Sequence, residues 1–149
     1  MNTNITKTWT IAINADEVFS RCTNESLYQA YKRTNNQSGD ALVMQEDDRS
    51  QFDVYFSVAL ANLQMILARR MSTQKLDTAL SLTFVLDMHD NNDDNILPIL
   101  INHCYEYLVK KVLEQWYKAD FGSELEKLEI NHCLHYRKNP IRRRLSPLC

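Results

Sequence analysis

Only two of the 149 residues are glycine, Gly39 and Gly122. A Walker loop or a dinucleotide-binding loop needs several backbone positions without a Cβ atom, so this chain cannot build one. An all-β fold is disfavoured for a similar reason, because its many tight turns rely on glycine. Long apolar stretches at helical spacing indicate a mainly helical protein instead, and this length is typical of one domain around a single core.

Four segments place apolar residues on one helical face: 15–33, 46–70, 98–118 and 123–138. Two others, 8–13 and 80–87, alternate apolar and polar residues as half-buried strands do, and we expect these two to pair. The predicted fold class is mainly α, about a four-helix bundle with a small two-stranded β element and an extended basic C-terminal tail. Residues 1–136 would form the single domain, and residues 137–149 would form the tail.

The predicted helices carry further expectations about burial and capping. In the first helix we expect Leu27, Tyr28 and Tyr31 to join the buried face. In the second helix the apolar arc is wide, so we expect this helix to be contacted on more than one side. The residues that widen the arc are Val54, Val58, Ala61 and Met65. In the fourth helix, Ser123 and Glu126 match the spacing of an S-x-x-E capping box.

Charge is distributed unevenly along the chain. The formal net charge is −2, which excludes a chain that binds nucleic acid through its overall charge. The last thirteen residues nevertheless hold five positive charges, which leaves −7 for residues 1–136. An acidic body with a basic tail can pair between neighbouring subunits.

The basic tail also contains apolar residues between its cations, which a purely solvated tail does not need. We expect it to dock onto another subunit or partner, although a solvated tail and a nucleic-acid contact are the alternatives. The candidate partner-binding residues are Arg137, Lys138, Ile141, Arg142, Arg143, Arg144, Leu145 and Leu148.

The four cysteines form no C-x-x-C pair, and residues 1–7 are polar, without the apolar region of a signal peptide. We therefore expect reduced thiols in a protein made in the cytoplasm. The cysteines are Cys22, Cys104, Cys133 and Cys149. No stretch is long and apolar enough to cross a membrane, so we expect no membrane contact.

Two patterns resemble metal sites. Asp90, Asn92 and Asp94 match the first positions of a calcium loop, but Asn95 and Ile101 occupy its glycine and glutamate positions. Turn-closing and helix-capping side chains explain this run better.

A zinc site is the second pattern. His132 and His135 are neighbours on one helical surface and could form half of such a site, completed by His103 or Cys104. Histidines hydrogen-bonded on a mixed helix face are the simpler interpretation. The chain also has no catalytic signature such as G-x-S-x-G or H-E-x-x-H, so we expect no catalytic residues, no resident metal and no cofactor.

The order of these features is familiar. The motifs are TWTIAI at 8–13, DEV at 16–18, DDR at 47–49, EQWY at 114–117 and YRKNPIRR at 136–143. In this order the chain resembles small structural proteins of tailed bacteriophages and prophages. Its layout is also similar to the helical head–tail connector, or adaptor, proteins of those phages.

The resemblance implies a structural subunit of the phage neck, located in the virion between capsid and tail and assembled in the host cytoplasm. Such proteins form homo-oligomeric rings under the portal and contact the portal and tail or other neck proteins. DNA would pass through the assembly without being bound by it. Only the basic P-I-R-R segment at 140–143 corresponds to a docking element.

Other functions stay open at this point. Many helical connectors lack a strand pair, which leaves room for a tail-completion or terminator protein of the same neck. A small nucleic-acid-binding module acting through the tail is another alternative, and a zinc-stabilised regulatory module is a third.

Overall fold

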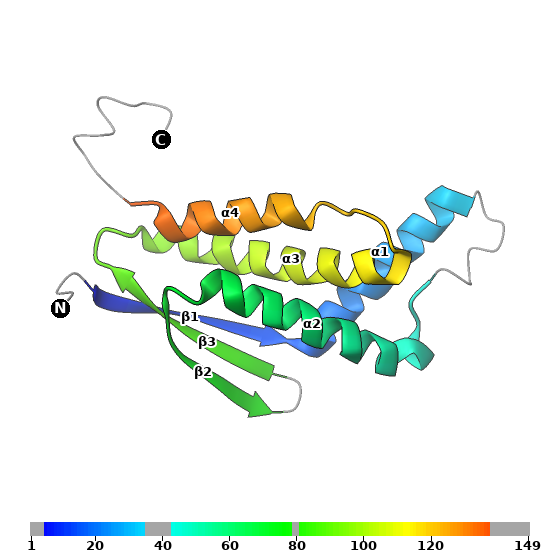
Figure 1. Cartoon of the computed structure of the whole chain (residues 1–149), viewed down its shortest axis with the longest axis horizontal. Coiled ribbons are helices and arrows are strands. Elements are labelled where there is room, and N and C mark those ends of the chain that lie inside the picture. Colours follow the sequence, from blue (N-terminus) through cyan, green and yellow to red (C-terminus); the bar gives the residue numbers. More distant parts are fainter. Residues whose placement is uncertain (1–4, 35–42, 79–80, 138–149) are drawn as a thin grey trace, which may run out of the picture.

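A computed structural model describes residues 5–34, 43–78 and 81–137 of the chain. Four helices and three strands make up most of this part (Figure 1). In chain order the elements are β1 (Ile5–Asn14), α1 (Ala15–Thr34), the short 3₁₀ helix η2 (Glu46–Asp48), α2 (Arg49–Leu67), β2 (Met71–Thr78), β3 (Ser81–His89), η3 (Asp94–Ile96), α3 (Leu97–Tyr117) and α4 (Ser123–His135). The mainly helical fold class is therefore confirmed.

The strands form one antiparallel sheet in the order β1-β3-β2. The predicted pair is present as β1 and β3, in a register that places Trp9 opposite Leu86 and Ile11 opposite Phe84. The third strand, β2, was not predicted and corrects the two-stranded expectation. Its sequence, MSTQKLDT, lacks the apolar alternation by which the other strands were predicted.

Alternate residues of β1 and β3 point into the core. Successive side chains of a strand face opposite sides of the sheet, so one face can be buried and the other open. On β1, Trp9, Ile11 and Ile13 are buried, whereas Thr10 and Ala12 are exposed. The helices thus cover one face of the sheet, and the core lies between the two layers (Figure 1).

Helix α3 is the centre of the helical layer. It packs against α1, α2 and α4, and Figure 1 shows it lying between α2 and α4. Seven of its residues are buried: Leu100, Cys104, Tyr107, Leu108, Val109, Val112 and Leu113. Because α3 supports every other helix, it fixes the relative positions of the surfaces described below.

The second half of α1 corrects a prediction. Leu27, Tyr28 and Tyr31 are 58%, 59% and 67% exposed instead of buried. The Tyr117 hydroxyl, in the last residue of α3, donates to the Ser26 carbonyl. Beyond Ser26, α1 has therefore passed the end of α3, and this part of α1 projects from the body (Figure 1).

The start of α4 corrects a second prediction, because Ser123 and Glu126 do not form a capping box. Gly122 is the N-cap residue, with a φ of 88° that favours glycine. The Ser123 hydroxyl donates to Glu114 on α3 at 2.8 Å, and the same carboxylate accepts from the Phe121 and Ser123 N–H groups. Glu114 thus satisfies the Ser123 N–H, one of the N–H groups at the start of α4 that have no partner within the helix.

Candidate functional site

One buried side chain holds the end of α4 and Arg137, the residue that follows Tyr136, in place. Asn92, in the turn after β3, is fully buried. Its amide nitrogen donates to the Tyr136 carbonyl at 2.8 Å and to the Leu134 carbonyl at 3.4 Å. A backbone bridge also joins Asn92 to Arg137. Because carbonyls at a helix end lack partners within the helix, Asn92 supplies the donor that fixes the end of α4, and the bridge holds Arg137 beside it.

The same turn is tied to the first strand. Asp94 accepts a hydrogen bond from the Trp9 indole at 2.9 Å and pairs with Lys7 at 2.9 Å. Lys7 also donates to the Asn92 carbonyl. Asn92 and Asp94 therefore serve different partners, and the side chain of Asp93 closes the turn by accepting from the Asn95 N–H at 3.0 Å. This confirms the interpretation of the run as turn-forming.

Of the predicted partner-binding residues, only Arg137 lies in the described part of the chain, where it is exposed. The remaining ones lie outside the described residues: Lys138, Ile141, Arg142, Arg143, Arg144, Leu145 and Leu148. Arg137 is close enough to Arg70 for its charge to affect the pKa of the Arg70 side chain. Burial, and then the charge of Arg137, lower the pKa of the Arg70 guanidinium. Two cations that form no ion pair within the described part of the chain therefore lie near each other beyond the end of α4.

Next to Arg70 lies a groove of about 440 Å³ between the end of α2 and α4. We call it the basic groove. Its charged residues are Arg69 and Arg70, after α2, and Lys127 on α4, and His135 lies at its edge. Apolar lining comes from Met65, Ile66 and Leu134, and no carboxylate is among the described residues that line it. This arrangement suits an anionic group attached to something apolar.

The sequence did not predict the basic groove. Arg69 and Arg70 had a simpler explanation as cations at a helix C-terminus, where the helix dipole favours them. Lys127 comes from a helix far along the chain. Only the packing of α2 and α4 on α3 brings these residues together.

A line of exposed apolar residues runs along α2, and we call it the α2 stripe. Val54 is 62% exposed, Val58 49% and Met65 75%, and Ala61 is also exposed. Their spacings of four, three and four residues place them on one face. Helix α2 does contact α1, α3 and α4, but the four residues that were expected to be covered are exposed, so their predicted burial is wrong. Contiguous exposed apolar patches of this kind mark interaction sites.

The structure does not bring the candidate zinc ligands together. His103 Nδ1 lies 2.6 Å from Glu126, and Cys104 is buried in the core. His132 packs against the Tyr136 ring, and His135 Nδ1 lies 2.7 Å from the Asn131 carbonyl oxygen. Within the described part of the chain, no group of three or more His, Cys, Asp or Glu side chains could hold a metal ion.

The described cysteines, Cys22, Cys104 and Cys133, are free and buried. Burial, assisted by the charge of Glu25, raises the pKa of the Cys22 thiol to about 12. Burial also raises the pKa values of the Cys104 and Cys133 thiols. Because the thiolate is the reactive form, these are core residues of low reactivity.

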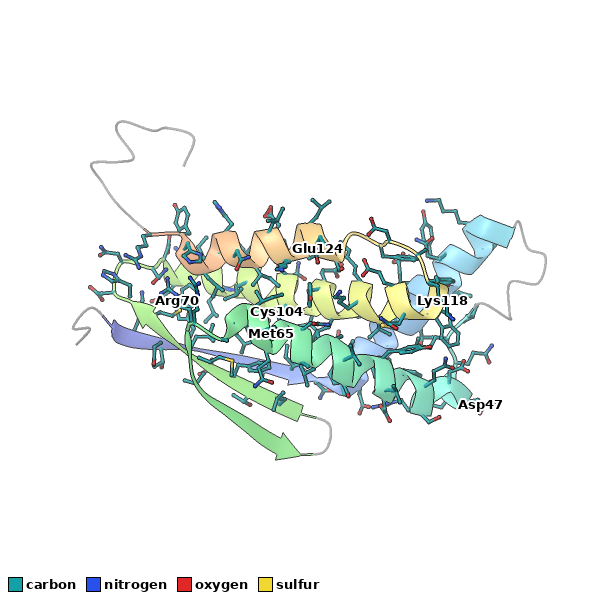
Figure 2. All side chains as sticks on the ribbon, viewed as in Figure 1. Asp47, Met65, Arg70, Cys104, Lys118 and Glu124 are labelled. Carbon is teal, nitrogen blue, oxygen red and sulfur yellow. The ribbon has the colours of Figure 1, made fainter. Side chains whose placement is uncertain are left out.

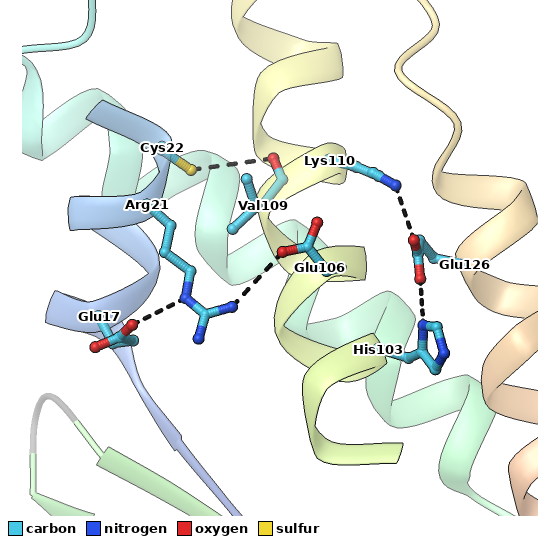
Figure 3. A network of polar contacts seen from close by, with 8 residues as sticks. All are labelled: Glu17, Arg21, Cys22, His103, Glu106, Val109, Lys110 and Glu126. Atoms are coloured by element: carbon cyan, nitrogen blue, oxygen red, sulfur yellow. Dashed lines mark hydrogen bonds and ion pairs between the residues drawn. The ribbon is translucent and has the colours of Figure 1, made fainter. Parts of the chain in front are cut away.

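Polar contacts join α3 to two of its neighbours, α1 and α4 (Figure 3). On one side Arg21 of α1 pairs with Glu17 at 2.9 Å and with Glu106 of α3 at 3.6 Å. On the other side the Glu126 carboxylate of α4 contacts Lys110 at 2.8 Å and His103 at 2.6 Å. The contacts of Glu106, Lys110 and His103 have a packing role, since each connects α3 to another helix, whereas the Arg21–Glu17 pair lies within α1.

Glu126→Gln tests the contribution of the second contact. Burial acts to raise the pKa of Glu126, but its hydrogen bonds with Lys110 and His103 hold the pKa below the ordinary 4.5. A carboxyl group whose pKa is lower in the folded than in the unfolded protein stabilises the fold at pH values above its unfolded pKa. This stabilisation is lost as the pH falls through the pKa of the folded protein. At neutral pH we expect the free energy of unfolding of the variant to be about 1–2 kcal/mol lower than that of the wild type, because Lys110 and His103 lose a half-buried anionic partner.

Urea denaturation at several pH values measures this effect. The deficit of the variant should shrink as pH is lowered below 4.5, where wild-type Glu126 itself becomes protonated. Glu124→Gln, an exposed change on the same helix, is the control. If the difference in stability between the variant and the wild type did not change with pH, the ionised Glu126 carboxylate would not be its cause.

Comparison with known proteins gives no relative, since no protein family, curated protein or solved structure matches this chain. Within the described residues, no helix combines the length and apolar character needed to span a membrane.

Proposed function

We propose that this protein is a structural subunit of a tailed-phage neck, a head–tail connector or adaptor. It works by assembly and not by catalysis. Copies of the chain associate into a ring, and the basic tail, residues 137–149, docks onto a neighbouring subunit. The portal and the tail or other neck proteins are the further partners. In this proposal the four helices act as one bundle, with the tail as a separate docking arm.

The α2 stripe is the observation that carries the proposal. Burying Val54, Val58 and Met65 in an interface would contribute about 1.5–3 kcal/mol for each side chain that becomes fully buried. Association costs about 4–15 kcal/mol in lost translational and rotational freedom. The stripe alone therefore gives at most weak association, and a stable ring needs further contacts.

The basic tail supplies such contacts. Asn92 holds Tyr136 and Arg137, so the tail would start from the same position in every copy. The twelve residues after Arg137 span at most about 40 Å when extended, which is enough to reach a neighbouring domain of this size. Ile141, Leu145 and Leu148 would add apolar burial, and the arginines would pair with the acidic body of a neighbour.

Sedimentation velocity over a wide range of protein concentration tests self-assembly. We expect a concentration-dependent transition to one closed oligomer, visible as a ring by negative-stain microscopy. A chain that stays monomeric at every concentration would contradict the ring.

A second candidate is a tail-completion or terminator protein of the same neck. The antiparallel sheet of β1, β3 and β2 favours it, because many helical connectors lack such a sheet. Pull-down against isolated portal rings and isolated tail tubes distinguishes the two, since a connector binds the portal and a terminator binds the tube.

A further inference from the structure

The positive charge of the basic groove is not balanced within the described part of the chain. Arg69, Arg70 and Lys127 form no ion pair there. Arg137 adds a fourth cation close to Arg70. Cations that converge on one groove without a carboxylate leave a strong attraction for an anionic partner.

The complementary charge lies at the other end of α2. Glu46, Asp47 and Asp48 form an acidic run just before the helix, and we call it the acidic segment. Glu46 and Asp47 are exposed. The neighbouring cation, Arg49, is already paired with Asp16 at 2.9 Å and Asp53 at 3.0 Å. The acidic segment is therefore available to a cation from another molecule.

The positions of the two charged regions favour a head-to-tail contact. Helix α2 has 19 residues and is about 28 Å long. Figure 2 shows Asp47 and Arg70 at opposite ends of the molecule, with Met65 near the Arg70 end. Copies that follow one another along this direction bring the acidic segment of one copy beside the basic groove of the next. A repeated contact of this kind closes into a ring when its rotation permits.

We propose that the basic groove binds the acidic segment, residues 46–48, of a second copy of this chain. This inference rests on the proposed self-assembly and adds the identity and direction of the contact. Met65 belongs both to the groove and to the α2 stripe, so the charged and apolar contacts form one continuous surface. Nucleic acid fits less well, because residues 1–136 carry −7 and repel a long polyanion.

Charge reversal in the full-length chain tests the contact. The groove variant is Arg69→Glu with Lys127→Glu, and the segment variant is Glu46→Lys with Asp47→Lys. Arg70 is left intact because it is half-buried, so its replacement by glutamate would also disturb packing. Each variant alone should weaken self-association about tenfold or more, because it sets like charges against each other.

Mixing the two variants gives the sharper result. In the mixture, the acidic groove of one variant meets the lysine-bearing segment of the other, and the unchanged groove meets the unchanged segment. Self-association measured by sedimentation velocity should therefore return towards the wild-type value. Lys32→Glu with Lys111→Glu reverses two lysines elsewhere and should associate as the wild type does. Circular dichroism checks that every variant is folded.

Three results would overturn the inference. If folded groove and segment variants assemble as the wild type does, the contact is wrong while the proposed function stands. If the wild type is monomeric at every concentration, the contact and the ring both fail. If the groove variant loses affinity for a short double-stranded DNA and mixing restores no self-association, the groove is a nucleic-acid site.

Discussion

Replacing Val58 and Met65 with aspartate is expected to turn the assembled protein into monomers without unfolding it. Both side chains are already exposed in the single chain, Val58 by 49% and Met65 by 75%, so the fold loses little. In the interface each change removes about 1.5–3 kcal/mol of apolar burial and adds a charge that must be desolvated. Because about 1.4 kcal/mol is a tenfold change in affinity, we expect at least a hundredfold weaker association.

A matched pair of substitutions locates the interface. Leu125 and Leu128 on α4 are exposed to a similar extent, by 68% and 62%. Leu125→Asp with Leu128→Asp introduces the same chemistry on another helix and should leave assembly intact. Light scattering measures the mass of each variant, and thermal unfolding checks its fold. An α2 variant that still assembles fully would show that the stripe is not the contact.

The second large effect is on stability. Asn92→Ala should cost about 2–3 kcal/mol, because it removes the donor to two carbonyls at the end of α4 and leaves them unsatisfied. The Asn92 amide oxygen is buried without a hydrogen-bond partner, so its removal adds no such cost. Urea denaturation gives the loss of stability. Hydrogen exchange should also show faster exchange in the last turn of α4.

Asn91→Ala is the control for this change. Asn91 is the exposed neighbour in the same turn, and its replacement should alter stability by no more than about 0.5 kcal/mol. If the Asn92 and Asn91 variants were equally stable, Asn92 would not be the residue that holds the base of the tail.

The elements that could be predicted from the sequence are those with strong periodicity. Trp9, Ile11 and Ile13 alternate strictly with polar or small residues, and the β1 strand followed from them. Strand β2 could not be predicted, because its sequence, MSTQKLDT, does not alternate apolar and polar residues. The exposed Tyr28 and Tyr31 were misplaced because helical spacing cannot show where the supporting helix ends.

The candidate site was predictable only in its composition. The cations of residues 137–149 are visible in the sequence, and of these the structure describes only Arg137, which is bridged to Asn92. The role of Asn92 was hidden in a run of Asp and Asn residues, in which any member could close a turn. For the α2 stripe, the signal was present as a wide apolar arc. Periodicity does not distinguish a face covered by the chain itself from one covered by a partner.

The most direct test of the account compares the mass of the full chain with that of a chain ending at Arg137. The shortened chain keeps the backbone bridge to Asn92 and loses only the part of the tail proposed to dock. Light scattering with negative-stain imaging should show a ring for the full chain and dissociated subunits for the shortened one. Rings of equal mass from both chains would contradict the docking role of the tail.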